Sequence, residues 1–154
     1  MYGKQTECAI AVMSRLAEVW DGGQVRLTSS ELAEARGLSK PIVAKVLSAL
    51  SQAGLVVGAP GPGGGFSLAM EPREIPINDV FVIFERDNYR QDCPFGGGAC
   101  GGDDPCPLHE RMAAVLEAMD TLLHETTFDV FRTARRKNQV RSRSARKPRG
   151  SRKR

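Results

Sequence analysis

Two short helices punctuated by glycine and followed by a glycine-rich hairpin constrain this chain more than any other feature. The segment Thr28-Ser29-Ser30-Glu31 has the pattern of a capping box, in which the first hydroxyl accepts from a backbone amide and the glutamate reaches back to the cap. A helix is therefore predicted from this segment to Arg36, with Gly37 ending it. Ser39 can cap a second helix that extends to about Gln52, with a proline tolerated in its first turn.

The residues after these helices predict a two-stranded hairpin. Residues 55–57 have the composition of a strand, and residues 66–69 alternate like a returning strand. The run 58–65 between them contains five glycines and two prolines, so it must turn. Helix, turn, helix and hairpin in this order predict a winged helix-turn-helix. For the two helices alone, an ordinary helical hairpin in a bundle is the alternative.

Further helices are expected on both sides of this motif. Apolar residues recur with a helical period over residues 3–20, and Asn78 is predicted to cap a short apolar helix to about residue 85. A long amphipathic helix should end near residue 124, and Thr126 or Thr127 can start a short helix carrying two phenylalanines. The apolar stripe of the long helix comprises Met112, Val115, Leu116, Met119, Leu122 and Leu123. The predicted fold is mainly α, with a winged helix-turn-helix domain over 1–85, a cysteine loop and dimerisation helix over 86–131, and a disordered basic tail over 132–154.

The charge of the chain is divided between two regions. All 18 acidic residues lie at or before Asp129, whereas the last 23 residues contain twelve Lys or Arg and no acid. Residues 1–131 therefore carry a net charge of −8 and residues 132–154 carry +12, although the whole chain carries only +4. This division predicts a folded body followed by a solvated tail that meets a polyanion. A tail that only increases solubility is the alternative.

The helix-turn-helix suggests which residues would contact DNA. In such motifs the second helix enters the major groove and its N-terminal side chains meet the base edges. Glycines in the hairpin turn allow close approach to phosphates. The candidate DNA-binding residues lie on the second helix, at the start of the first helix and in the hairpin turn: Ser39, Lys40, Pro41, Lys45, Ser48, Thr28, Gly63 and Gly64. The predicted partner is a double-stranded DNA operator.

Three of the four cysteines lie within fourteen residues, at Cys93, Cys100 and Cys106, and His109 follows three residues after the last of them. Clustered cysteines in a cytosolic chain are more typical of metal ligands or redox thiols than of structural disulfides. Thiolates suit both iron–sulfur clusters and zinc, but the spacing lacks the pair of Cys-x2-Cys knuckles of a zinc ribbon. His109 can ligate or can be an ordinary surface or capping residue.

The sequence also indicates in which compartment the protein is found and whether it is an enzyme. The longest apolar run near the N-terminus, residues 8–13, is too short to span a bilayer, and no charged-then-apolar leader precedes it. We therefore expect a cytoplasmic protein without a membrane partner. No motif pairs a nucleophile with a base or sets two carboxylates for acid–base chemistry, so no enzymatic activity is expected.

The chain resembles the Rrf2 family of bacterial winged-helix transcription regulators over about residues 3–131. The resemblance is carried by Ser30-Glu31-Leu32-Ala33-Glu34, Gly37-Leu38-Ser39, Leu50-Ser51-Gln52-Ala53-Gly54-Leu55-Val56, Gly61-Pro62-Gly63-Gly64-Gly65-Phe66 and the three cysteines before the long helix. Together these motifs are specific for the family, whereas any one of them alone would be a weak indication. The resemblance implies a homodimer in which the long helices cross and the cysteine loop packs near the DNA-binding domain.

The resemblance also implies a cofactor, an iron–sulfur cluster of the 2Fe–2S or 4Fe–4S type. Its cysteine ligands would be Cys93, Cys100 and Cys106. Some family members use as fourth ligand a histidine three residues after the last cysteine, which matches His109. Others use an acid from the partner's first helix, which matches Glu7 in this chain. Cys8, beside that acid, is a third candidate, although a cysteine on a packed helix is most often a small apolar residue.

Together these observations predict a cytoplasmic, homodimeric transcription regulator, a repressor, that senses redox, nitric oxide or iron–sulfur status through the cluster. One alternative is a regulator of the same fold without a cluster, which uses its cysteines as thiol switches. The other alternative belongs to a different class: an iron–sulfur or zinc protein whose basic tail binds RNA.

Overall fold

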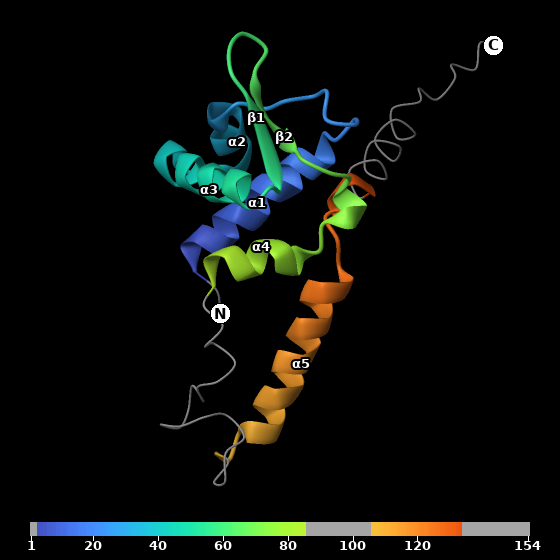
Figure 1. The fold of residues 1–154 in the computed structure, drawn as a ribbon. Coiled ribbons are helices and arrows are strands. Elements are labelled where there is room, and N and C mark those ends of the chain that lie inside the picture. Colours follow the sequence, from blue (N-terminus) through green and yellow to red (C-terminus); the bar gives the residue numbers. More distant parts are fainter. Residues whose placement is uncertain (1–2, 86–105, 134–154) are drawn as a thin grey trace, which may run out of the picture.

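Helix α1 (Lys4–Glu18) contributes the centre of the hydrophobic core in a computed structural model, which describes residues 3–85 and 106–133. Its apolar positions repeat with a helical period, so one face, including Val12 and Met13, is fully buried. The helix lies between an upper layer, made of α2, α3 and a two-stranded sheet, and α4 below it (Figure 1). The helical period predicted over residues 3–20 is confirmed.

The upper layer begins with α2 (Ser29–Arg36) and α3 (Lys40–Gln52). Thr28 is the N-cap of α2 and forms both halves of the predicted capping box with Glu31, and Gly37 ends the helix in the left-handed conformation at a φ of 63°. Ser39 is the N-cap of α3 as predicted, but its side chain makes no capping hydrogen bond.

The sheet consists of β1 (Val56–Ala59) and β2 (Gly65–Leu68), paired antiparallel with Val56 opposite Leu68. An isolated bridge adds Leu27, the residue before the α2 cap, to the outer side of β2 opposite Phe66. The predicted hairpin is therefore confirmed. The bridge, which joins residues 39 positions apart in sequence, lies outside what strand patterns indicate.

The lower part of the molecule contains η1 (Pro72–Glu74), α4 (Ile77–Phe84) and α5 (His109–Glu125). The prediction that Asn78 caps α4 is wrong, because the N-cap is Pro76 and Asn78 lies inside the first turn. The amide of Ile77 donates to the carbonyl of Thr126 at 2.9 Å, so a distant segment satisfies the start of this helix in place of a capping side chain.

Helix α5 projects downward from the other helices and packs on α4 (Figure 1). After α5 the chain returns to the core, where Phe128 is fully buried, and residues 129–133 are helical, which agrees with the short helix predicted after Thr126 or Thr127. Of the tail predicted over 132–154, residues 132 and 133 belong to this helical segment, and residues 134–154 lie outside the described residues. None of the helices in the described part of the chain is long and apolar enough to cross a membrane.

Candidate nucleic-acid interface and metal-ligand residues

Helix α3 presents one apolar face to the core and one polar face to solvent. Its buried residues are Val43, Val46, Leu47 and Leu50, and Ile42 is partly buried and packs against the same core. The exposed face carries the DNA-binding candidates Ser39, Lys40, Pro41, Lys45 and Ser48. Within residues 3–85 and 106–133, neither lysine has an ion-pair partner. The structure brings these five residues onto one surface, and their contact with DNA stays a prediction.

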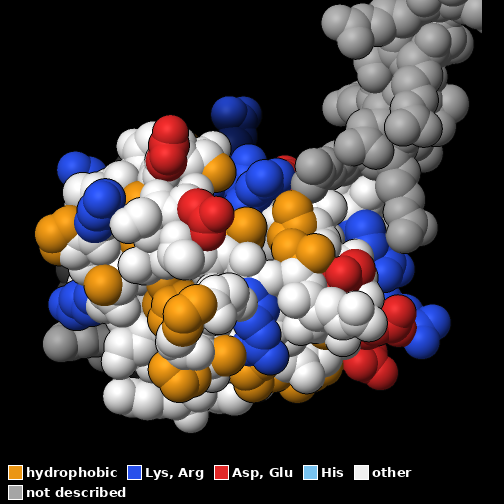
Figure 2. Space-filling model, turned by 90° about the horizontal axis from the view of Figure 1, so that it is seen from above, with side chains coloured by type: hydrophobic (Ala, Val, Ile, Leu, Met, Phe, Trp, Pro, Cys, Tyr) orange, Lys and Arg blue, Asp and Glu red, His pale blue; other side chains and the backbone are white. Residues whose placement is uncertain are grey.

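The sheet end of the molecule carries basic side chains close to α3. Figure 2 views the molecule from the upper end of Figure 1, with the tip of the hairpin toward the reader. Lys and Arg side chains lie along the left edge of this face, the side on which α3 lies in Figure 1, and others lie near its centre and right edge, whereas the Asp and Glu side chains lie in its upper part and at the right. Such a distribution favours a polyanionic partner at this end of the molecule.

The hairpin turn is built from glycines that serve the protein's own backbone. The amide of Gly64 donates to the carbonyl of Gly61 at 2.9 Å, and Gly63 has a φ of 73°, the geometry of a turn with proline and then glycine at its centre. A Cβ atom at Gly64 would lie 2.3 Å from the carbonyl oxygen of Ala59, whereas one at Gly63 would meet nothing within 4 Å. The turn therefore requires both glycines, Gly63 for its left-handed φ and Gly64 for its closeness to the Ala59 carbonyl, and of the two only Gly63 has open space beside it.

Thr28 has a structural role that limits its availability to DNA. Its hydroxyl accepts from the amide of Glu31 at 3.2 Å and donates to the Glu31 carboxylate at 2.8 Å, and its own amide donates to the same carboxylate at 2.7 Å. The backbone amide of Thr28, followed by its hydroxyl, lowers the pKa of the Glu31 carboxyl. A DNA contact by Thr28 stays a prediction.

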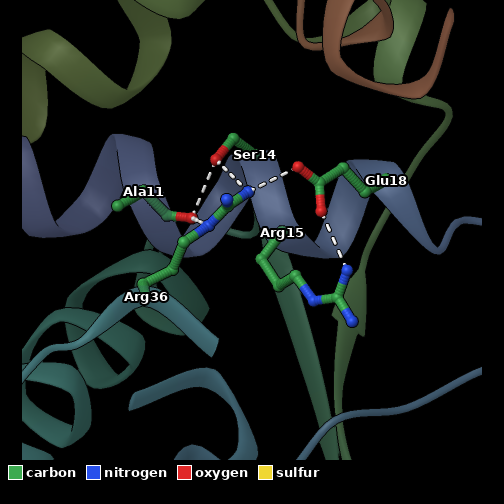
Figure 3. Close-up of polar contacts among 5 residues, drawn as sticks. All are labelled: Ala11, Ser14, Arg15, Glu18 and Arg36. Atoms are coloured by element: carbon green, nitrogen blue, oxygen red, sulfur yellow. Dashed lines mark hydrogen bonds and ion pairs between the residues drawn. The ribbon is translucent and has the colours of Figure 1, made fainter. Parts of the chain in front are cut away.

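Arg36, the last residue of α2, ties the helix-turn-helix to α1 (Figure 3). Its guanidinium donates to the carbonyl of Ala11 at 3.1 Å, to the hydroxyl of Ser14 at 2.9 Å and to the carboxylate of Glu18 at 2.7 Å. Arg15 donates to the other oxygen of Glu18 at 2.8 Å. Burial of Glu18 opposes ionisation, but the hydrogen bonds and charges of the two arginines outweigh burial and lower the pKa of its carboxyl.

Sequence reasoning missed Arg36 because its partners lie 18 to 25 residues away. An arginine at the end of a helix is already explained by the negative end of the helix dipole, so the pattern alone gives no reason to look for a tertiary partner.

The two ligand candidates on α1 differ in accessibility. Cys8 is 1% exposed, and burial raises the pKa of its thiol, so the thiolate that a metal requires is disfavoured. Glu7 is exposed, and it lines a cleft of about 440 Å³ between the start of α1 and the α2–α3 turn. Ser39 lines the same cleft. The expectation that Cys8 faces the core is confirmed, and Glu7 lies beside the start of the candidate recognition helix.

The other described ligand candidates lie at the start of α5. Cys106 is partly buried, and His109, the first residue of α5, donates its amide to the carbonyl of Cys106 at 2.9 Å. Cys93 and Cys100 lie outside the described residues. The start of α5 lies at the bottom of Figure 1, away from the start of α1, so within one chain the structure does not bring Glu7 to Cys106 and His109. No group of three or more possible metal ligands occurs among the residues that the structure describes.

Among the described ligand candidates, some side chains fit an iron–sulfur cluster and one does not. Soft thiolates are its usual ligands, and Cys106 has the partial exposure that a ligand needs. Histidine and carboxylate donors at His109 and Glu7 are both compatible with a fourth, more exchangeable position. Cys8 is the poorest fit among the described candidates because its burial keeps the thiol protonated.

The fold and the α3 surface define a winged helix-turn-helix protein, and comparison with known proteins identifies the family. The model of the Rrf2 family, described as an iron-dependent transcriptional regulator, matches residues 2–132. This chain therefore belongs to the Rrf2 family of transcription regulators. The predicted family resemblance and the predicted mainly helical winged fold are confirmed.

Individual relatives carry regulatory names. An HTH-type transcriptional regulator of Aquifex aeolicus is 34% identical over 100 residues, which cover 63% of this chain and 69% of the relative. The regulator IscR of Escherichia coli is 27% identical over 119 residues, which cover 77% of this chain and 72% of IscR. These relatives and the family are transcription regulators rather than enzymes, in agreement with the sequence expectation.

Solved structures show the same fold. CymR of B. subtilis, a global cysteine regulator, superposes with a TM-score of 0.70 at 20% identity, over 87% of this chain and 97% of CymR. IscR of T. potens superposes with a TM-score of 0.64 at 22% identity, over 97% of this chain and 93% of IscR. At these identities the likeness establishes the fold.

Proposed function

We propose that this transcription regulator is a homodimeric repressor that binds double-stranded operator DNA through α3 and the hairpin, and that an iron–sulfur cluster sets its DNA affinity. The observation that carries the DNA contact is the exposed face of α3, where Lys40 and Lys45 have no acidic partner among the described residues. Uncompensated charge on a helix that follows a helix-turn is what phosphate and base contacts require.

The homodimer is supported by the surface of α5. Val115 is 48% exposed and Leu122 is 58% exposed, and only Leu123 of the predicted apolar stripe is buried. Exposed apolar side chains along one helix favour burial against a second copy, as in the crossing of long helices that the family resemblance implies.

The cluster would be held by Cys93, Cys100 and Cys106, with Glu7 of the partner subunit or His109 as the fourth ligand. The family description as iron-dependent and the IscR relatives support iron chemistry. When bound, the cluster would supply chemistry that responds to redox state, nitric oxide or iron–sulfur supply. Glu7 shares a cleft with Ser39, so a change at Glu7 would act beside the first residues of α3.

The cluster is tested by purifying the protein without oxygen and measuring visible absorption, iron and sulfide. Substitution of Cys93, Cys100 or Cys106 by alanine should abolish the absorption, and Cys8→Ala is the matched cysteine control that should retain it. Loss of the true fourth ligand, in Glu7→Ala or His109→Ala, should shift the spectrum or speed cluster decay. Unchanged iron and sulfide after loss of one of the three clustered cysteines would exclude the cluster.

DNA binding is tested by selecting a duplex from a random pool with the wild-type protein and comparing Lys45→Ala with wild type on that duplex and on random DNA. If Lys45 contacts phosphate, affinity should fall similarly on both; if it reads a base, discrimination should fall by about 1–3 kcal/mol. Unchanged binding in both Lys40→Ala and Lys45→Ala would remove α3 from the interface.

The basic residues at 132–154 are proposed to add sequence-independent attraction to DNA. Deletion of residues 135–154 removes eleven of the twelve cations. If about half of them contact phosphates, the slope of log affinity against log salt should flatten by about 4–6, with sequence preference retained. An identical slope with and without these residues would exclude this role.

A second candidate function is a thiol-switch regulator of the same fold. It is favoured by the likeness to CymR, whose structures include an oxidised form from Staphylococcus aureus. A protein that contains no iron after anaerobic purification, and whose DNA affinity changes on oxidation only while the clustered cysteines are present, would establish this alternative.

A further inference from the structure

The basic side chains of the described residues fall into paired and unpaired groups. Arg15 and Arg36 are bound to Glu18, and Arg73 and Arg132 lie beside Glu71. Within residues 24–68, which hold the helix-turn-helix, the hairpin and the segment before them, three cations have no acidic partner among the described residues: Lys40, Lys45 and Arg26. The two lysines are accounted for by the α3 surface, so Arg26 is the unpaired cation of residues 24–68 without an assigned role.

Arg26 is held beside the hairpin by its neighbour. Leu27 forms two backbone hydrogen bonds with Phe66 of β2, at 2.9 Å and 2.8 Å. Gly65 allows this approach, since a Cβ atom there would lie 2.8 Å from the carbonyl carbon of Leu27 and 3.1 Å from the amide nitrogen of Thr28. The segment that carries Arg26 therefore forms one unit with the hairpin and the start of α2.

The side chain of Arg26 is partly accessible to solvent. Its neighbour Leu27 packs against the hydrophobic core. The residue before Arg26, Val25, is 41% exposed, so the segment that leads to Leu27 borders solvent. An arginine that is neither buried nor neutralised is free to meet an anion at this edge.

The hairpin itself contains no charge. Residues 56–68, which include β1, the turn and β2, have no Lys, Arg, Asp or Glu. A hairpin that lies against DNA without a cation gains little from the phosphates, whose contacts come mostly from basic side chains and backbone amides. Arg26 is the nearest cation along the strand that borders the hairpin.

We propose that Arg26 binds the phosphate backbone beside the hairpin and supplies the charge that the hairpin lacks. The proposal rests on the proposed DNA-binding function and extends it to a strand edge outside α3. The contact is electrostatic and independent of sequence, so it adds affinity and fixes the position of the hairpin without reading bases. In a dimer it occurs once per half-site.

The experiment compares Arg26→Gln, Arg26→Lys and the control Arg73→Gln in the full-length protein. Arg73 loses the same formal charge at η1, where Glu71 already neutralises it. Affinity is measured by fluorescence anisotropy from 50 to 300 mM salt, on a duplex selected by the wild-type protein and on a random duplex of equal length. Thermal unfolding of each variant reports whether the fold is retained.

Arg26→Gln should weaken binding about five- to tenfold per half-site on both duplexes and flatten the log–log salt slope by about 1 per half-site, or about 2 per dimer. Arg26→Lys should restore both quantities, because a phosphate contact needs the charge, and Arg73→Gln should match wild type. The proposal is overturned by a wild-type slope in Arg26→Gln, by a loss on the selected duplex only, or by Arg26→Lys behaving like Arg26→Gln.

The result separates this proposal from the function on which it rests. If Lys45→Ala weakens binding and Arg26→Gln does not, the α3 interface stands and the Arg26 contact is excluded. If the wild-type protein binds neither duplex, both are excluded.

Discussion

The helix-turn-helix with its hairpin, residues 28–68, and helix α5 bury their apolar residues in different ways. Four residues of α3 and two of α2 are buried in the core shared with α1. Helix α5 is longer, 17 residues against 13 for α3, yet only Leu123 is buried. The first region is thus completed within one chain, whereas Val115 and Leu122 of the second are left exposed among the described residues.

This difference indicates how the two regions obtain their stability. Burial of apolar side chains is the main favourable contribution to folding, so the helix-turn-helix is stabilised by contacts that every copy of the chain contains. The stripe of α5 gains comparable stabilisation only when a second surface covers it, so its contribution should depend on protein concentration.

The largest effect on stability should follow from creating a cavity in the core of the helix-turn-helix region. Leu50 is fully buried on α3, and Leu50→Ala should reduce the free energy of unfolding by about 2–5 kcal/mol because it leaves a cavity. Leu122→Ala on α5, where the side chain is 58% exposed, should change the stability of the monomer by less than about 0.5 kcal/mol. Urea unfolding at low protein concentration measures both. Equal losses of unfolding free energy in the two variants would show that α5 is stabilised within one chain as α3 is.

A slightly smaller effect is expected from charging the α5 surface. The double substitution Val115→Glu and Leu122→Glu should raise the dimer dissociation constant at least about tenfold, or 1.4 kcal/mol, because two carboxylates would have to be buried. Analytical ultracentrifugation gives the constant. Met70→Glu, a charge placed on a 38% exposed apolar residue outside α5, is the control. Dimerisation unaffected by the double variant would place the dimer interface elsewhere.

The connection between α1 and the helix-turn-helix can be weakened at Arg36. Arg36→Met removes three hydrogen bonds while keeping the aliphatic part of the side chain, and should cost about 1–2 kcal/mol in the free energy of unfolding. Arg15→Met removes one i,i+3 ion pair and should cost less than about 0.5 kcal/mol. If both variants lose the same stability, the contacts of Arg36 with α1 contribute nothing beyond a surface ion pair.

The smallest effect is a dependence on pH at Glu18. The pKa of its carboxyl is lower in the folded chain than the ordinary value of 4.5, so its contribution to stability is complete above pH 4.5 and is lost as the pH falls through the folded pKa. The stability difference between wild type and Glu18→Gln, less than about 1 kcal/mol at pH 7, should therefore shrink as the pH falls below 4.5. Urea unfolding across this range measures it, and a difference that grows in acid would contradict the assignment.

Sequence patterns predicted the elements whose causes are local. The capping box at Thr28 and Glu31, the left-handed Gly37 and the proline–glycine turn of the hairpin each depend on residues within a few positions of one another, so the chain shows them directly. The α3 surface followed from the same local periodicity, since buried and exposed positions alternate with the helical repeat.

Only the tertiary structure decided which distant groups meet. It placed Pro76 rather than Asn78 at the start of α4, because the carbonyl of Thr126 accepts from the amide of Ile77. It likewise brought the guanidinium of Arg36, at the end of α2, into contact with α1, and it brought the segment that carries Arg26 beside the hairpin. These contacts join residues about 20 to 50 positions apart in sequence, and no helical or strand period encodes such a pairing. They form because closing the core brings the backbones together, and the side chains and amides at each junction then bind whichever groups lie within reach.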